Sequence, residues 1–539
     1  MSGAKMEIPE KMKILVAALA ALFFGLLSAL FFIVPLGNFS RKLLGTSQWA
    51  PDNILNAGLL EWGYKAFSTH KPVFNWLAGW PVSNSLAGGE NLLGWQVFYT
   101  PLRVFGVGTV AATNGLMFLS FVVAALGAVA FAKHYGLRNP AAFCAGLAFA
   151  FCPAKEGNII QLQSMAVCWV PWALFYLERF RTSGKYSDAS LSIIIICLTM
   201  LSGMYIGIFL FLTIAIMILV RWNWQGVYRS IVVAATSLLL LSPVLWHYLD
   251  FNRRYGLVKD VGYMETHSVG LASLFQPSDI SALWGSIGSS KSTPFLGFTF
   301  LALIFFGLWK GGLPRKDELQ ISIVAGVLTL LACGPALILN VAPVTVLGHY
   351  IPMPGRLFAF LPGIRVPSRI LMLAMLFASV LAGAGFSAVV ARFGKKAGLI
   401  AALCLLAESY PAPWLAANSV FLSEPMAMAD AYRNLRGCTA IVELPMDDAQ
   451  DASRDVYAAA GDLTPTVSYY GSMMLKEPSR LQDAAERLPN ESAKSELVQS
   501  GVNCLVVHQF DGYEPLLERL TAAYSTKYVG KDSTIFNLN

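Results

Sequence analysis

Two acidic side chains of the type that can act as a general base lie between apolar runs of this chain. Asp52 heads the segment APDNILNAGLLEWGYKAF (50–67), and Glu156 lies in CPAKEGNIIQLQ, between two short apolar runs. A carboxylate that takes a proton from a reacting hydroxyl contributes typically about 10²–10⁴-fold to a rate. Each residue also has a structural alternative. Asp is favoured at the N-cap of a helix, and Glu156 can pair with the adjacent Lys155.

Basic side chains that suit a phosphate group gather in GHYIPMPGRLFAFLPGIRVPSRI (348–370). Arg365 and Arg369 approach the next apolar run, and a guanidinium can hold a phosphate by two parallel hydrogen bonds. Lys155 is a third candidate. Arginines at the start of a membrane span also contact lipid phosphates, so the sequence leaves both readings open.

Further polar and aromatic residues around these groups are candidates for lining a substrate site: Glu90, Asn91, Trp62, Gln161 and His349. Trp62 belongs equally to the aromatic belt that proteins place at a membrane interface. Leu55, Leu59, Trp62 and Ala66 follow Asp52 at helical spacing. This pattern predicts an amphipathic helix that lies along the membrane surface, with Asp52 at its head.

The composition is that of a polytopic membrane protein. The 539 residues are 56% hydrophobic and 13% charged, whereas a soluble domain is about 25% charged. No basic run alternates with aromatic residues, which argues against nucleic acid as a partner. No phosphate-binding Gly-rich loop, GxSxG or HExxH motif is present. The apolar runs carry almost no ionisable residues, which argues against an ion-coupled carrier.

Apolar runs long enough to approach a bilayer crossing predict about eleven transmembrane helices, over residues 14–36, 111–132, 140–153, 162–178, 189–202, 204–220, 230–247, 295–309, 319–335, 367–390 and 397–408. Two divisions are ambiguous, because 140–177 and 189–220 can each be one long helix or two short ones. If both runs are divided, Lys and Arg concentrate in the short loops on the side of the N-terminus. Dividing only one run would put basic loops on both sides, whereas leaving both undivided would restore the same orientation downstream. The positive-inside rule then predicts a cytoplasmic N-terminus and an extracytoplasmic C-terminus.

The long segments then all lie outside: 37–110, 248–294, 336–366 and 409–539. We expect residues 1–408 to form the transmembrane domain and 409–539 to form a small extracytoplasmic α/β domain. CTAIVELPM (438–446) and NCLVVHQF (503–510) are typical of strands, and ESAKSELVQSG and EPLLERLTAAY are typical of helices. Cys438 and Cys504 can pair if this part is extracytoplasmic. No cysteines show CxxC spacing, and we predict no zinc site.

The order of these pieces resembles the GT-C class of polytopic glycosyltransferases, which includes protein O-mannosyltransferases, oligosaccharyltransferases and the aminoarabinose transferase of lipid A. It is most similar to a group of bacterial integral membrane proteins assigned as glycosyltransferases. The stretches that carry the resemblance span most of the chain: APDNILNAGLLEWGYKAF, ENLLGWQVFYTPLRVFG, AFCAGLAFAFCPAKEGNIIQLQSMAVCWVPWALFYLERF, LSGMYIGIFLFL, PMPGRLFAFLPGIRVPSRILMLAMLFASVLAG and AIVELPM.

The resemblance implies a polyprenyl-phosphate-linked sugar as donor and an extracytoplasmic glycan, lipid or protein as acceptor. It implies that Asp52 is the catalytic base and that Glu156 is the closest match to a second acidic residue. Many members carry two adjacent acidic residues in the first loop, whereas Asp52 is followed by Asn53. We therefore predict no metal cofactor, although a divalent metal is compatible with the class. The alternatives are a lipid or polysaccharide transporter or flippase, and a non-catalytic scaffold of the same fold.

Overall fold

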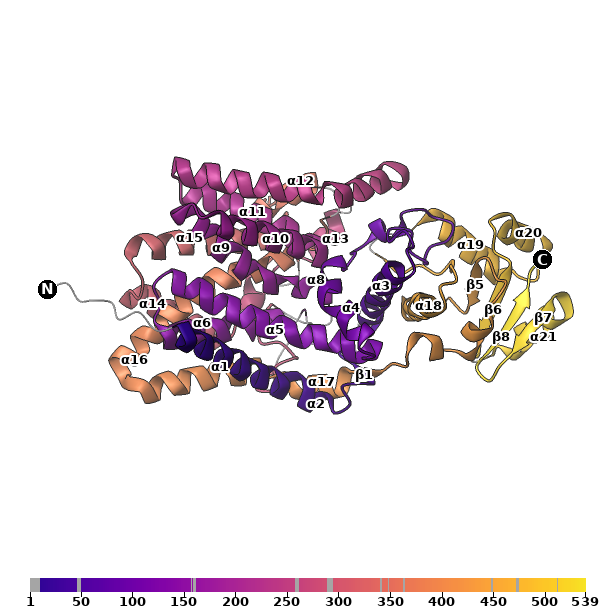
Figure 1. The fold of residues 1–539 in the computed structure, drawn as a ribbon, viewed down its shortest axis with the longest axis horizontal. Helices are drawn as coiled ribbons and strands as arrows, with labels where there is room; N and C mark the ends of the chain where they lie inside the picture. The colour runs from indigo at the N-terminus through magenta and orange to yellow at the C-terminus, as the bar shows by residue number, and fades with distance from the viewer. Residues whose placement is uncertain are drawn as a thin grey trace.

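The structure is a computed structural model. It describes residues 10–45, 50–156, 158, 161–256, 261–287, 294–339, 342–347, 349–361, 364–446, 449–471, 475–510 and 512–539. Figure 1 shows a bundle of helices at the N-terminal end of the long axis and a small sheet with its own helices at the C-terminal end. The helix α3 (Ala50–Ser68), which carries Asp52, lies between the two.

The predicted apolar runs all contain helices. These are α1 (Glu10–Ser28), α5 (Thr109–His134), α6 (Asn139–Ala150), α9 (Val170–Ser183), α10 (Tyr186–Ser202), α11 (Met204–Val220), α12 (Trp224–Tyr255), α14 (Phe298–Lys310), α15 (Arg315–Ala332) and α16 (Leu371–Ser409). In the described residues, four helical stretches are long and apolar enough to cross a membrane: Leu15–Leu36, Thr109–His134, Trp224–Tyr255 and Pro367–Asn418. The chain is therefore a helical membrane protein, and the count of eleven spans stays a prediction.

Both ambiguous runs are divided. The run 189–220 breaks at Gly203, whose backbone is extended between α10 and α11. The run 140–177 is interrupted by the short helices α7 (Pro153–Glu156) and α8 (Leu162–Met165). The reading of either run as one continuous helix is wrong. Gly394, with a φ of 83°, likewise divides α16 within the predicted gap between 390 and 397.

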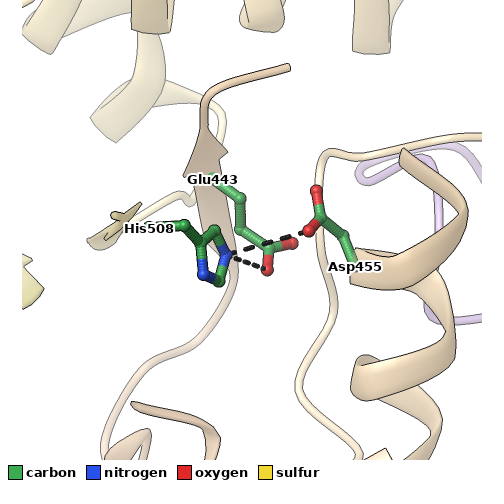
Figure 2. Close-up of side chains that lie close together, drawn as sticks. All are labelled: Glu443, Asp455 and His508. Carbon is green, nitrogen blue, oxygen red and sulfur yellow. Dashed lines mark ion pairs between the residues drawn. The ribbon is translucent and has the colours of Figure 1, made fainter. Parts of the chain in front are cut away.

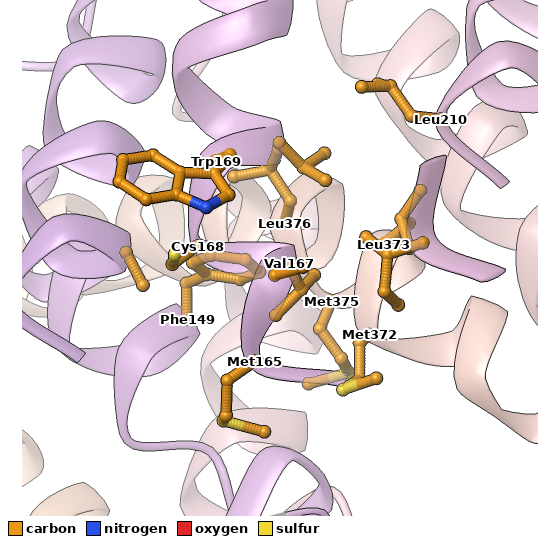
Figure 3. Close-up of a cluster of buried hydrophobic side chains, with 14 of the residues drawn as sticks. Phe149, Met165, Val167, Cys168, Trp169, Leu210, Met372, Leu373, Met375 and Leu376 are labelled. Atoms are coloured by element: carbon orange, nitrogen blue, oxygen red, sulfur yellow. The ribbon is translucent and has the colours of Figure 1, made fainter. Parts of the chain in front are cut away.

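A buried apolar cluster holds these broken segments in place (Figure 3). Met165 of α8 and Val167, Cys168 and Trp169 of the following 3₁₀ turn lie with side chains of α6, α11 and α16: Phe149, Leu210, Met372, Leu373, Met375 and Leu376. Tight packing of this kind fixes side-chain positions and transmits strain. The start of α8, and Gln161 immediately before it, are thereby held on a rigid support.

The C-terminal segment contains a four-stranded sheet of order β5-β6-β8-β7: β5 (Ile441–Leu444), β6 (Cys504–His508), β8 (Ser533–Asn537) and β7 (Ser525–Val529). β5 and β6 are parallel, and the other pairs are antiparallel. The helices are α18 (Ala449–Asp462), α19 (Lys476–Glu486), α20 (Glu491–Gln499) and α21 (Glu514–Ala523). Both predicted strands and both predicted helices are present, and Cys438 and Cys504 form a disulfide.

The loop after α3 and the C-terminal segment are joined by backbone pairing that the sequence analysis did not anticipate. The Thr466 amide donates to the Leu77 carbonyl over 2.8 Å, and the Trp80 amide donates to the Thr466 carbonyl over 3.0 Å. The strand-like stretch around Thr466 also pairs with Ile441 of β5. The loop after α3 therefore extends the C-terminal sheet, and the two parts share one structure.

The helix α3 is covered on both faces. A Cβ atom added at Gly58 would lie 3.2 Å from the Tyr457 Cα atom of α18, so these two helices are in backbone contact. The polar residues Asn56 and Glu61 are buried, and Glu61 accepts from Arg103 over 2.9 Å. The predicted helix is present, but its polar face is not exposed, because α18 and the ion-paired Arg103 cover it.

Candidate active site

Asp52 lies in the first turn of α3 and its carboxylate is held from two sides. Its Oδ2 accepts a hydrogen bond of 2.9 Å from Gln161 Nε2, and its Oδ1 accepts one of 2.8 Å from the Tyr470 hydroxyl. The helix begins at Ala50, so Asp52 is not at the N-cap. The positive end of the helix dipole still favours the ionised carboxylate there. Three segments distant in the sequence therefore meet at this side chain.

Gln161 connects Asp52 to a buried cation. Its Oε1 accepts a hydrogen bond of 2.8 Å from Arg369 Nη2 and one of 3.2 Å from the Ser164 hydroxyl. The amide can satisfy both neighbours in one orientation only, with its NH₂ group toward the carboxylate and its oxygen toward the guanidinium. Asp52 and Arg369 are thus held one amide group apart.

The Arg369 guanidinium retains hydrogen-bonding capacity. The side chain is buried and lies over the Tyr205 ring, 4.9 Å from its centroid. Among the described residues, no acceptor contacts its buried Nε–H group. A buried donor without a partner costs about 1–3 kcal/mol, and an oxygen of a bound ligand would remove that cost. Arg369 stands in the 3₁₀ turn Pro367–Ile370, directly before α16.

Two further predicted residues lie around the same Tyr205. The backbone amide of Arg365 donates to the Tyr205 hydroxyl over 3.2 Å, and its guanidinium lies 5.1 Å from the centroid of Tyr263. Glu90 accepts a 2.7 Å hydrogen bond from the Met204 amide at the start of α11. Burial raises the pKa of Glu90, and the positive charge of Arg369 opposes that rise. Glu90 and Arg369 therefore lie in each other's electrostatic field.

Other predicted site residues have structural contacts. The Trp62 indole is buried and donates to the Val73 carbonyl over 2.8 Å. Asn91 accepts from the Leu93 amide and donates to the Tyr248 hydroxyl. His349 lies on the exposed strand β3 (His349–Tyr350), which pairs with β2 (Thr345–Val346). None of these contacts joins the Asp52–Gln161–Arg369 network, and a substrate-lining role for the three residues stays a prediction.

Lys155 and Glu156 stand on α7, a few residues before Gln161. The Lys155 side chain is buried, and its ammonium lies 4.0 Å from the centroid of the Phe121 ring. A cation over an aromatic face is stabilised by the ring quadrupole. The Glu156 side chain lies outside the described part of the structure, so the predicted role of Glu156 as a second acid stays a prediction.

Tyr470 and Tyr205 were missed by the sequence analysis. Burial and the negative charge of Asp52 both raise the pKa of Tyr470, so its hydroxyl remains a proton donor at neutral pH. Tyr470 lies in a polar stretch more than 400 residues after Asp52, and no local pattern marks it. Tyr205 follows the Ser202-Gly203 break between two apolar runs. That break was the one sequence signal that could have directed attention to this turn.

Comparisons with known proteins identify the fold. No protein-family model and no curated protein sequence matches the chain. The arabinofuranosyltransferase AftD from Mycobacteria matches with a TM-score of 0.62 at 16% identity, over 97% of this chain and 40% of that one. The chain therefore spans less than half the length of AftD.

Two shorter glycosyltransferases also match. The apo structure of ArnT from Cupriavidus metallidurans has a TM-score of 0.50 at 12% identity, over 98% of both chains. The oligosaccharyltransferase of Archaeoglobus fulgidus, solved in complex with zinc and sulfate, has a TM-score of 0.53 at 13% identity. The match covers 91% of this chain and 68% of the oligosaccharyltransferase chain. The resemblance inferred from the sequence is confirmed at the level of architecture: the chain has the fold of the GT-C glycosyltransferases.

Proposed function

We propose that this protein is a glycosyltransferase of the bacterial inner membrane that moves a sugar from a polyprenyl-phosphate donor to an extracytoplasmic glycan, lipid or protein. The observation that carries the proposal is the fixed connection Asp52–Gln161–Arg369, with hydrogen bonds of 2.9 and 2.8 Å. It holds a base and a cation side by side at the end of a helical bundle. The fold supports the donor class, since ArnT was also solved bound to undecaprenyl phosphate.

The reaction is a single displacement at the anomeric carbon. The acceptor hydroxyl oxygen forms the new bond to this carbon while the bond from the carbon to the donor phosphate oxygen breaks. Asp52 takes the hydroxyl proton, and the polyprenyl phosphate leaves with the electron pair. One displacement inverts the configuration of the sugar. A base in this role contributes about 10²–10⁴-fold.

Arg369 is the principal group for the leaving phosphate. Its buried guanidinium carries full positive charge where negative charge develops, and such preorganised charge is often the largest catalytic contribution. Glu90 offsets that charge in its ionised form, which Arg369 favours and burial opposes. Arg365 lies beside the same Tyr205 and would contact a second phosphate oxygen. Lys155, packed on Phe121, would contribute through its charge rather than by direct contact.

The outer face of the membrane is the proposed location of the site. Cys438 and Cys504 form a disulfide, and disulfides form and persist in oxidising compartments. The basic residues of the short loops favour a cytoplasmic N-terminus by the positive-inside rule. Nucleotide sugars are cytoplasmic, so a lipid-linked donor suits a transferase on the outer side.

The test is Asp52→Asn in membranes supplied with a polyprenyl-phosphate sugar. We expect transfer to fall at least about 100-fold at unchanged protein level. Asp250→Asn is the matched control, because Asp250 is an outer-side aspartate that pairs with Arg254 on α12. Full transfer by the Asp52 variant would remove Asp52 from the mechanism. Absence of transfer by the wild-type protein with any such donor would favour the transporter or the scaffold.

A further inference from the structure

Three side chains that bind metals in other proteins converge within the C-terminal segment. Glu443 lies on β5, Asp455 on α18 and His508 at the end of β6. Figure 2 shows the imidazole of His508 facing both carboxylates. One potential ligand atom from each residue lies within 4.8 Å of the other two, and the described part of the chain holds no other such group of three. In open α/β sheets, ligands bind at the carboxyl ends of parallel strands, which is where His508 stands.

The distances from His508 to the two carboxylates are too long for hydrogen bonds, but they suit three ligands that share one metal ion. His508 Nε2 lies 3.5 Å from Glu443 Oε1 and 3.8 Å from Asp455 Oδ1, whereas an N–H···O hydrogen bond spans about 2.7–3.2 Å. Two ligands of a tetrahedral zinc ion, each about 2.1 Å from the metal, lie about 3.4 Å apart. The Nε2 atom is buried and, among the described residues, has no hydrogen-bond partner.

The carboxylates are already oriented by other donors. The Tyr432 hydroxyl donates to Glu443 Oε1, and the Thr466 hydroxyl donates to Oε2 over 2.5 Å. The Ser468 hydroxyl donates to Asp455 Oδ2 over 2.7 Å. Metal ligands are characteristically held by such outer hydrogen bonds, which fix their direction. A bound cation would also relieve the repulsion between two buried carboxylates this close.

We propose that Glu443, Asp455 and His508 form a divalent-cation site that takes zinc, with the fourth position open to water. An imidazole nitrogen with two carboxylate oxygens suits zinc and disfavours calcium or magnesium, which bind oxygen ligands. The occupied site would tie β5, α18 and β6 together. It would also fix the stretch of Thr466 and Ser468, which ends two residues before Tyr470. The binding of the metal is independent of the proposed transfer reaction.

The experiment measures metal in the purified full-length protein. After treatment with EDTA and then zinc, followed by desalting, elemental analysis should find about one zinc ion per chain. Zinc should raise the thermal unfolding midpoint of the wild-type protein by at least about 3 °C, whereas calcium should not change it. A wild-type protein that retains no zinc and shows no shift would overturn the proposal, and so would an equal shift with calcium.

His508→Gln and Glu443→Gln should each abolish the retained zinc and the zinc-dependent shift. His70→Asn is the control, because His70 is an exposed histidine of the first outer loop and its loss should change neither readout. Retention of zinc by His508→Gln would show that the ion binds elsewhere and would overturn the assignment. If a variant does not fold, the wild-type comparison between EDTA, zinc and calcium still decides the question.

Discussion

The Tyr470 hydroxyl donates a 2.8 Å hydrogen bond to Asp52, a residue 418 positions earlier in the chain. The other carboxylate oxygen of Asp52 accepts a hydrogen bond from Gln161. The C-terminal segment therefore does more than cover the membrane bundle, because it supplies a side chain to the proposed base. In the proposed reaction, the Tyr470 hydroxyl orients the carboxylate and stabilises its negative charge until an acceptor hydroxyl approaches.

Tyr470→Phe should lower sugar transfer about 10-fold, since a hydrogen bond to a charged group contributes about 1.5–3 kcal/mol. The decisive measurement is kcat at matched protein level and matched unfolding midpoint, because a purely structural effect would lower the amount or the stability of the folded protein as well.

Tyr469→Phe is the matched control for this variant. The Tyr469 hydroxyl is buried and, among the described residues, has no hydrogen-bond partner. Its removal should leave the rate unchanged. Equal losses in the Tyr469 and Tyr470 variants would show that the region responds to packing alone and that Tyr470 does not act on Asp52.

Gly203→Ala should impair transfer from a distance. A Cβ atom at Gly203 would lie 2.1 Å from the backbone oxygen of Gln163. Something must move, and the contacted residue Gln163 is two positions after Gln161, which connects Asp52 to Arg369. A displacement of about 1 Å in a catalytic group can cost about 100-fold in rate. We expect a loss of about 10–100-fold, measured as kcat with the protein level and unfolding midpoint recorded in parallel.

Gly326→Ala provides the comparison for that substitution. Gly326 lies within α15, and an added Cβ atom there would meet nothing within 4 Å. Alanine is favoured over glycine in a helix by up to about 1 kcal/mol, so this variant should keep full transfer and be slightly more stable. Normal transfer by the Gly203 variant would mean that the α10–α11 turn tolerates movement and does not position the site.

Much of the architecture was predictable, because local patterns determine it. Apolar runs predicted the helices, Gly203 and the Lys155-Glu156 pair marked the breaks, and apolar strand patterns predicted β5 and β6. Asp52, Arg365 and Arg369 were selected as candidates from their residue types and their places beside apolar runs. The contacts among them were not predictable. Gln161 and Tyr470 meet Asp52 only through long-range packing, and neither residue carries a distinctive local pattern.

The burial of α3 by other parts of the chain was also unpredictable, because it too depends on long-range packing. Its sequence shows one apolar face and polar residues opposite, which usually indicates solvent on the polar side. Here α18 packs directly against the helix, with Tyr457 against Gly58. The pairing partner for Glu61 is Arg103, 42 residues later. A buried carboxylate with a distant partner has the same sequence pattern as an exposed one.

The disulfide gives a test of topology. Cys438 and Cys504 should remain oxidised in cells that are rapidly alkylated before lysis, so that a thiol reagent labels them only after reduction. Replacing Cys438 by Ser should destabilise the C-terminal segment by about 4 kcal/mol, as expected for a loop of 66 residues. Free thiols at both positions in unreduced cells would place this segment in the cytoplasm and contradict the proposed orientation.

Asp462, at the end of α18, should make the stability of this segment depend on pH. Burial raises the pKa of Asp462 to about 6 from an ordinary value of 3.8, although hydrogen bonds from Thr464 oppose the rise. Below about pH 4 the carboxyl group is protonated in both the folded and the unfolded chain. Between about pH 4 and 6 it ionises first in the unfolded chain, so the folded state loses stability as pH rises.

Asp462→Asn should therefore stabilise the protein at pH 8 and change little near pH 4. The asparagine oxygen can still accept from the Thr464 amide, which donates to Asp462 over 3.0 Å. The full shift corresponds to at most about 3 kcal/mol, and partial exposure reduces this to about 1–2 kcal/mol. Thermal unfolding of both proteins from pH 4.5 to 8 measures the difference, with Asp483→Asn, an exposed aspartate of α19, as control. A stability difference that is constant across this range would show that Asp462 is not the titrating group.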